Sequence, residues 1–169
     1  AAGSISAALP NPVTAGALQV EPWMKLPGSG FVAYGQPSKY EDKVVRTWNT
    51  APGTIGTGTS RTPHHLLDGM ITPNGLHFER HHSGIPDINP DTHRLLNHGL
   101  VKRPLIFTLE TLARYPMESR IAFIECGGNG QLLYQKEPAQ VGVQQIHGQV
   151  SCAEWTGVKL AVLLQEAGV

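Results

Sequence analysis

The apolar residues of this chain fall in short runs, and glycine and proline separate the runs. Between Leu95 and Phe107 the apolar pattern is broken at residues 97–99 and again at 103–104. This pattern predicts brief strands joined by turns. Residues 121–124 are wholly apolar over a length too short for a helix, and they predict a buried central strand.

Two short helices are predicted further along the chain. Thr108 is a suitable N-cap for a helix with one apolar face, and Pro116 ends that helix. Thr156 is expected to cap a second helix, and Gly168 is placed to end it in a left-handed conformation. The residues that this second helix should bury are Leu160, Leu163, Leu164 and Ala167. Short strands mixed with short helices predict an α+β fold.

The composition narrows the class of protein. The 169 residues, 40% of them hydrophobic, are enough for one globular domain with a core. Thirteen basic residues balance thirteen acidic ones, and no basic stripe alternates with aromatic residues, so nucleic-acid binding is excluded. No apolar run approaches the roughly 20 residues that cross a bilayer, so no membrane span is expected. Nineteen glycines and thirteen prolines predict many turns, and we expect loops to carry the function.

Three parts follow one another along the chain. Residues 1–20 carry no charge and are rich in alanine, serine and glycine, which predicts either the remnant of a signal peptide or a disordered tail. Residues 21–62 are rich in proline and glycine, and their scattered aromatic residues are typical of an extended arm that wraps a neighbouring surface. Residues 63–169 hold the predicted strands and helices and form the main domain.

A dense polar group lies in the first half of the main domain. An arginine beside two histidines offers donors for an anionic ligand such as phosphate. Three histidines in this group also suggest zinc, although the HExxH arrangement is absent and flanking glycine and proline disfavour a helix. The residues of the group are His77, Phe78, Glu79, Arg80, His81 and His82.

Cys126 opens a glycine-rich turn directly after the apolar run 121–124. Three glycines among the next four residues let the backbone approach a ligand and direct its N–H groups toward one point. Such donors favour the thiolate, which is the form that binds a metal. The alternative is a buried cysteine in an ordinary turn.

Two further interpretations remain open from the residues alone. The histidines and Cys126 could serve a zinc-dependent hydrolase or a small binding module. Cys126 and Cys152 could instead form a disulfide that staples an extracellular domain. Their different surroundings argue against that pairing, because Cys126 begins a glycine turn whereas Cys152 precedes an aromatic residue.

Taken together, these segments resemble the sulfite oxidase family of molybdopterin enzymes. The order of three motifs agrees with the family, and so does the step of 26 residues between the two cysteines (152 − 126 = 26). Within the family the resemblance is strongest to the catalytic molybdenum subunits of sulfane dehydrogenases in bacterial thiosulfate oxidation. The motifs are Phe78-Glu79-Arg80-His81-His82, Glu125-Cys126-Gly127-Gly128-Asn129 and Trp155-Thr156-Gly157-Val158-Lys159-Leu160.

The resemblance implies a sulfite-oxidase-type molybdopterin-binding fold with mixed sheets and short helices. Residues 63–169 are expected to form the front part of this domain, which would then be incomplete at the C-terminus. It implies a molybdenum-molybdopterin cofactor whose metal is bound by Cys126, since a soft thiolate completes the metal's sulfur ligands. Cys126 and Arg80 are then the catalytic residues, and the 169 residues alone are expected to be inactive. The implied cofactor-binding residues are Phe78, Glu79, Arg80, His81, His82, Cys126 and Cys152, the last standing where the family has threonine.

The resemblance also implies substrate and partners. The expected reaction is oxidation of sulfane sulfur on a carrier protein, with free sulfite as the alternative substrate. Sulfite oxidases carry arginines where this chain has Gly130 and Gln131, so we expect a neutral site that suits a carrier better than a free dianion. No CxxCH haem motif occurs, so a c-type cytochrome subunit is the expected electron acceptor in a hetero-oligomer. Export to the periplasm as a folded protein, by the twin-arginine route, is expected.

Overall fold

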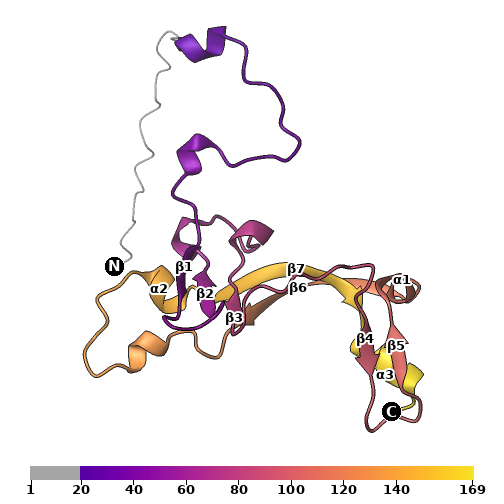
Figure 1. The fold of residues 1–169 in the computed structure, drawn as a ribbon. Coiled ribbons are helices and arrows are strands. Elements are labelled where there is room, and N and C mark those ends of the chain that lie inside the picture. Colours follow the sequence, from indigo (N-terminus) through magenta and orange to yellow (C-terminus); the bar gives the residue numbers. More distant parts are fainter. Residues whose placement is uncertain (1–19) are drawn as a thin grey trace, which may run out of the picture. The chain divides into compact units, whose positions relative to one another are not determined.

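The computed structural model describes residues 20–169 and divides the chain into two units, residues 1–37 and 38–169. The expectation for residues 1–20 therefore lies almost wholly outside the described residues. In the first unit a short 3-10 helix, η1 (Pro22–Lys25), starts at a proline and exposes Trp23 and Met24. All other elements belong to the second unit (Figure 1).

A three-stranded antiparallel sheet opens the second unit, after the short 3-10 helix η2 (Lys39–Glu41). Its strands are β1 (Thr47–Thr50), β2 (Gly58–Arg61) and β3 (Arg80–His81), in the order β1-β2-β3. The 3-10 helices η3 (His64–Leu66) and η4 (Asn74–Leu76) lie between β2 and β3. The sequence assigned residues 21–62 to one arm, whereas β1 and β2 share a sheet with the histidine-rich segment.

A small hairpin and a helix follow, as the sequence predicted. Strands β4 (Leu95–Asn97) and β5 (Leu105–Phe107) pair antiparallel, with Gly99 in the turn at a φ of 99°. Helix α1 (Leu109–Leu112) is capped by the Thr108 side chain, which accepts a hydrogen bond from the Thr111 amide. These local predictions are confirmed.

The longest strands form a two-stranded antiparallel ribbon, β6 (Met117–Glu125) with β7 (Val150–Val158) (Figure 1). The connection between them holds the 3-10 helix η5 (Gln131–Tyr134) and helix α2 (Val143–His147). The prediction that residues 121–124 are buried is wrong, because Ile121 is 58% and Phe123 67% exposed. Among the described strands β6 pairs only with β7, so neither neighbour strands nor a packed layer cover these side chains.

Helix α3 (Leu160–Ala167) closes the described chain. Gly168 ends it in the left-handed conformation that the sequence predicted, at φ 81° and ψ 45°. The prediction of a Thr156 cap is wrong, because Thr156 lies within β7 and its hydroxyl is 2.6 Å from that of Ser119 on β6. Leu163 and Ala167 are buried, as expected, but Leu160 is exposed.

Three small sheets with short helices make an α+β structure. Helix α3 lies against the β4–β5 hairpin, since the Arg103 amide donates to the Ala167 carbonyl at 2.9 Å. Among residues 20–169, no helix has the length and apolar character needed to cross a bilayer.

Candidate functional site

Cys126 stands at the end of the β6–β7 ribbon, where pairing gives way to a tight turn. Its amide donates to the Gln149 carbonyl at 2.9 Å, and its carbonyl accepts from the Asn129 amide at 2.8 Å. The Gly128 amide points at the Cys126 sulfur, with N and Sγ 3.4 Å apart. Gly130, at a φ of 75°, supplies the left-handed residue that lets the turn continue. The backbone thus presents an N–H donor to the thiol, as the glycine pattern predicted.

The Asn129 side chain stabilises this turn through two hydrogen bonds. Its Oδ1 accepts from the Gln149 amide at 3.1 Å, and its Nδ2 donates to Glu125 Oε1 at 2.9 Å. One amide side chain therefore joins the end of β6 to the residue before β7. Sequence reasoning assigned Asn129 no role beyond its place in the motif.

The thiol lines a cavity of about 220 Å³ together with Arg61 and Arg80. Arg80 Nη1 donates to the Gly58 carbonyl at 3.2 Å, and Arg61 Nη1 donates to Asn49 Oδ1 at 2.9 Å. Arg61 Nε is buried and has no hydrogen-bond partner. Among residues 20–169, no aspartate or glutamate lines this cavity. The sequence predicted a neutral site around Gly130 and Gln131, but the fold brings two guanidinium groups to the cavity from β2 and β3.

Glu79, which directly precedes β3, and the two residues of β3 point alternately to opposite sides, and this separates the predicted cofactor residues. Arg80 faces the Cys126 cavity, whereas Glu79 and His81 line a second cavity of about 440 Å³. Phe78 is buried and stacks on the His77 ring, with centroids 5.3 Å apart. His82 is exposed, and its carbonyl accepts a hydrogen bond from the Thr57 hydroxyl. Of the polar group predicted from sequence, the structure places only Arg80 in one cavity with Cys126.

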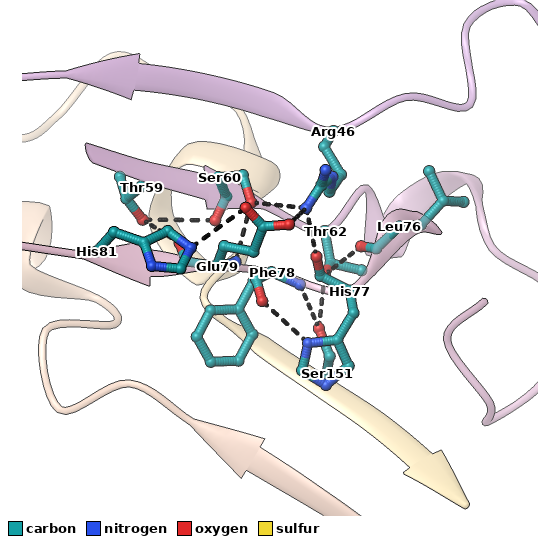
Figure 2. Close-up of polar contacts among 10 residues, drawn as sticks. All are labelled: Arg46, Thr59, Ser60, Thr62, Leu76, His77, Phe78, Glu79, His81 and Ser151. Carbon is teal, nitrogen blue, oxygen red and sulfur yellow. Dashed lines mark hydrogen bonds and ion pairs between the residues drawn. The ribbon is translucent and has the colours of Figure 1, made fainter. Parts of the chain in front are cut away.

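Arg46 anchors this segment to the rest of the sheet (Figure 2). Its Nη1 lies 2.6 Å from Glu79 Oε1, 3.2 Å from Ser60 Oγ and 2.9 Å from the His77 carbonyl oxygen. The Arg46 hydrogen bond and charge lower the pKa of Glu79 below 4.5, and burial opposes them. His81 Nε2 lies 3.4 Å from Glu79 Oε2 and makes no hydrogen bond there by geometry.

Two buried hydroxyls, of Thr62 and Ser151, also hold the segment around Phe78 (Figure 2). The Phe78 amide donates to Ser151 Oγ at 3.1 Å, and Ser151 Oγ is 2.7 Å from Thr62 Oγ1. Thr62 Oγ1 donates its single hydrogen to the Leu76 carbonyl at 2.8 Å, so Ser151 must donate to Thr62. Both hydroxyl side chains are 0% exposed. Sequence reasoning missed Thr62 and Ser151, because neither carries a local signal of its partners.

Cys152 lies apart from Cys126. It is opposite Phe123 in the ribbon and lines a third cavity, of about 120 Å³, together with His64. The Cys126 amide is bonded to Gln149, three residues from Cys152, which places the two cysteines about 10 Å apart along the ribbon. A disulfide needs Cα atoms within about 7 Å, and both cysteines are free. The disulfide interpretation is wrong for this structure, and the cofactor role predicted for Cys152 remains a prediction.

The zinc interpretation finds no ligand set in residues 20–169, where no three histidine, cysteine, aspartate or glutamate side chains converge on one point. One thiol beside two guanidinium groups instead fits a metal that brings its own sulfur ligands on an anionic organic group.

Comparison with known proteins agrees with this chemistry. The family described as "Oxidoreductase molybdopterin binding domain" matches residues 82–169. The chain is 32% identical over 107 residues to the mitochondrial sulfite oxidase of Rattus norvegicus, covering 63% of this chain and 20% of that protein. It is 31% identical over 112 residues to the NADH nitrate reductase of Ulva prolifera, covering 65% and 13%. The chain thus spans a fifth or less of the length of these relatives.

Among solved structures, the sulfane dehydrogenase SoxCD from Paracoccus pantotrophus matches with a TM-score of 0.79 and 38% identity. The match covers 89% of this chain and 39% of that chain. At this identity the likeness extends beyond the fold, and the sulfite-oxidase-type fold expected from sequence is confirmed. The chain therefore belongs to the family of oxidoreductase molybdopterin-binding domains of the sulfite oxidase type, and molybdenum carried by molybdopterin is its cofactor.

Proposed function

We propose that the protein oxidises sulfane sulfur carried on a partner protein and passes the electrons to a c-type cytochrome. The observation that carries the proposal is a cavity lined by Cys126 in a chain 38% identical to a sulfane dehydrogenase. The nitrate reductases among the relatives share the cofactor domain, so the domain alone does not decide the substrate.

The residues present fit the cofactor. Cys126 would bind the metal through its sulfur, and the Gly128 amide stabilises the thiolate by its N–H. Arg80 would contact an anionic group of the pterin or of the substrate. When bound, the cofactor supplies a two-electron redox couple to a sulfur substrate. The chain's own part is to hold the thiol, fix the cations and shape the cavity.

Charge in the cavity bears on the substrate. The neutrality expected from Gly130 and Gln131 does not hold, since Arg61 and Arg80 both line the cavity. Two guanidinium groups suit an anion, and a persulfide end and a sulfite ion are both anionic. Free sulfite is therefore the second candidate substrate, and these two arginines are the observation that favours it.

The partner and compartment follow from the same proposal. The similarity to the sulfane dehydrogenase SoxCD supports an acceptor haem carried by a separate cytochrome subunit in a hetero-oligomer. The uncharged residues 1–20 are consistent with export to the periplasm, where such cytochromes receive electrons.

The test compares kcat/KM for sulfite and for a persulfidated carrier protein, using the full-length holoenzyme. Electron transfer is followed in parallel with ferricyanide and with a c-type cytochrome. We expect preference for the carrier and loss of turnover in Cys126→Ser, because a hydroxyl is a harder and less acidic ligand than a thiol. Cys152→Thr, in its separate cavity, is the matched control and should retain most activity. A clear preference for free sulfite would overturn the proposed substrate.

A further inference from the structure

We infer that Gln149 is a positioning residue, which holds the Cys126 turn at a fixed place against the strands that carry Arg80. Cys126 and Arg80 line one cavity, yet they come from different sheets, since Arg80 lies on β3 and Cys126 follows β6. Their separation therefore depends on what joins the two sheets beside the cavity. The inference deepens the proposed function and rests on it only for the reaction whose rate is measured.

The main chain of Gln149 belongs to the Cys126 turn. Its carbonyl accepts a hydrogen bond from the Cys126 amide at 2.9 Å, and its amide donates to Asn129 Oδ1 at 3.1 Å. Gln149 directly precedes β7, so it also stands at the start of the strand that pairs with β6. Whatever holds the Gln149 side chain therefore also holds the residue that bears the thiol.

The side chain of Gln149 reaches the other sheet. Its Nε2 donates to Thr59 Oγ1 at 2.9 Å, across 90 residues of chain. Thr59 is the residue of β2 that stands opposite Arg80 in the pairing with β3. The carbonyl of Gly58, the neighbour of Thr59, accepts from Arg80 Nη1 at 3.2 Å. One side-chain bond thus connects the Cys126 turn to the strand that holds both the main chain and the guanidinium group of Arg80.

The hydrogen bonds of Thr59 fix which way the Gln149 amide faces. The Thr59 hydroxyl has one hydrogen, which it donates to the backbone, with the Glu79 carbonyl at 3.2 Å and the Ser60 carbonyl at 3.4 Å. Toward Gln149 this hydroxyl can then only accept, so the NH₂ end of the amide lies toward it. A glutamate in place of Gln149 would keep the length of the side chain but lose the donor.

Other bonds between the two sheets lie away from the cavity. The Thr62 amide donates to the Gly148 carbonyl at 2.8 Å, and the Thr62 and Ser151 hydroxyls are 2.7 Å apart, but none of these three residues lines the Cys126 cavity. These bonds should keep the fold intact in Gln149→Ala, while the groups beside the cavity become free to shift. A misplacement of about 1 Å in an active site costs roughly 100-fold in rate.

The first experiment measures kcat/KM per bound molybdenum in the full-length holoenzyme, with sulfite and with a persulfidated carrier. We expect a fall of roughly ten- to hundredfold in both Gln149→Ala and Gln149→Glu, because both lose the donor to Thr59. Thr59→Val removes the acceptor and should fall by a similar factor, whereas Thr59→Ser keeps the hydroxyl and should retain most of the rate. The matched control is Gln165→Ala on the exposed side of α3, which should leave the rate unchanged.

A double-mutant cycle separates positioning from a general structural effect. If Gln149 acts through Arg80, Gln149→Ala should lower kcat/KM by less than about twofold in a chain that already carries Arg80→Gln. A general structural effect would lower the rate by the same factor in both backgrounds. Equal factors in the two backgrounds, or full activity in both Gln149→Ala and Thr59→Val, would overturn the inference.

Hydrogen exchange of the same holoenzymes gives a second readout that needs no turnover. Peptides over residues 57–61 and 79–82 should exchange faster in Gln149→Ala, because β2 and β3 lose their tie to the Cys126 turn, whereas the β4–β5 hairpin should not change. Gln165→Ala should match the wild type in all of these peptides. Unchanged exchange at β2 and β3 in Gln149→Ala would also refute the inference. A preference for sulfite would refute the proposed substrate and leave the role of Gln149 unaffected.

Discussion

The buried hydroxyl pair offers the sharpest test of what holds the site together. Ser151→Ala removes the acceptor of the Phe78 amide and the donor to Thr62 in a place that water does not reach. Leaving the Phe78 amide unsatisfied costs about 1–3 kcal/mol, and the lost bond to Thr62 adds roughly 1 kcal/mol. Thr62 keeps its bond to the Leu76 carbonyl, so it adds no further orphaned donor. We expect a total destabilisation of about 2–4 kcal/mol.

Urea unfolding of the full-length protein measures this loss as a lower midpoint at unchanged m-value. The matched control is Ser119→Ala, which deletes an exposed hydroxyl from a pair on the same ribbon and should cost less than about 0.5 kcal/mol. Hydrogen exchange of the peptide over residues 76–79 should speed up only in Ser151→Ala. Equal midpoints for the two variants would refute the assignment of energy to the buried pair.

Two further predictions concern charge and backbone at the site. Glu79→Gln should unfold at a lower temperature than the wild type at neutral pH, and the difference should shrink as the pH falls below 4.5, since the arginine hydrogen bond stabilises only the ionised carboxylate. The loss in free energy of unfolding should stay below about 1 kcal/mol, because the Glu79 side chain is 37% exposed. A difference in unfolding temperature that widens in acid would contradict this prediction. Gly130→Ala should cost about 1–2 kcal/mol at its φ of 75°. Gly127→Ala, with open space around it and no positive φ, should cost less than about 0.5 kcal/mol by the same urea assay, and equal losses would remove the backbone argument.

Much of the local structure was predictable from sequence. The β4–β5 hairpin, the Thr108 cap and the Gly168 terminator each depend on residues a few positions apart, which a single segment displays. The helix cap at Thr156 was predicted wrongly because a cap is recognised from local sequence alone. In the structure Thr156 pairs with Ser119 on β6 instead. The exposure of residues 121–124 could not be predicted in the same way, since burial depends on what packs against a strand.

The site residues also fall into two groups, those that a short sequence motif predicts and those that only long-range contacts bring to the site. Cys126 and Arg80 belong to short motifs, and the structure brings them into one cavity. Arg61 reaches that cavity only because β2 pairs with β3, and Ser151 meets Phe78 across 73 residues of chain. A two-residue strand is also too short to reveal its alternation, so the sequence could not show that Glu79 faces away from the thiol.

The hydroxyl pair has a consequence for how the protein is made. Thr62 and Ser151 are 89 residues apart, and Gln144 reaches back 99 residues to the Val45 carbonyl. Loops of this length close slowly, because chain entropy must be lost before any contact repays it. During synthesis the segment at Phe78 would leave the ribosome well before Ser151 does. The Cys126 cavity can then take its final form only after β7 has been made. A cofactor that needs this finished cavity would be inserted after folding.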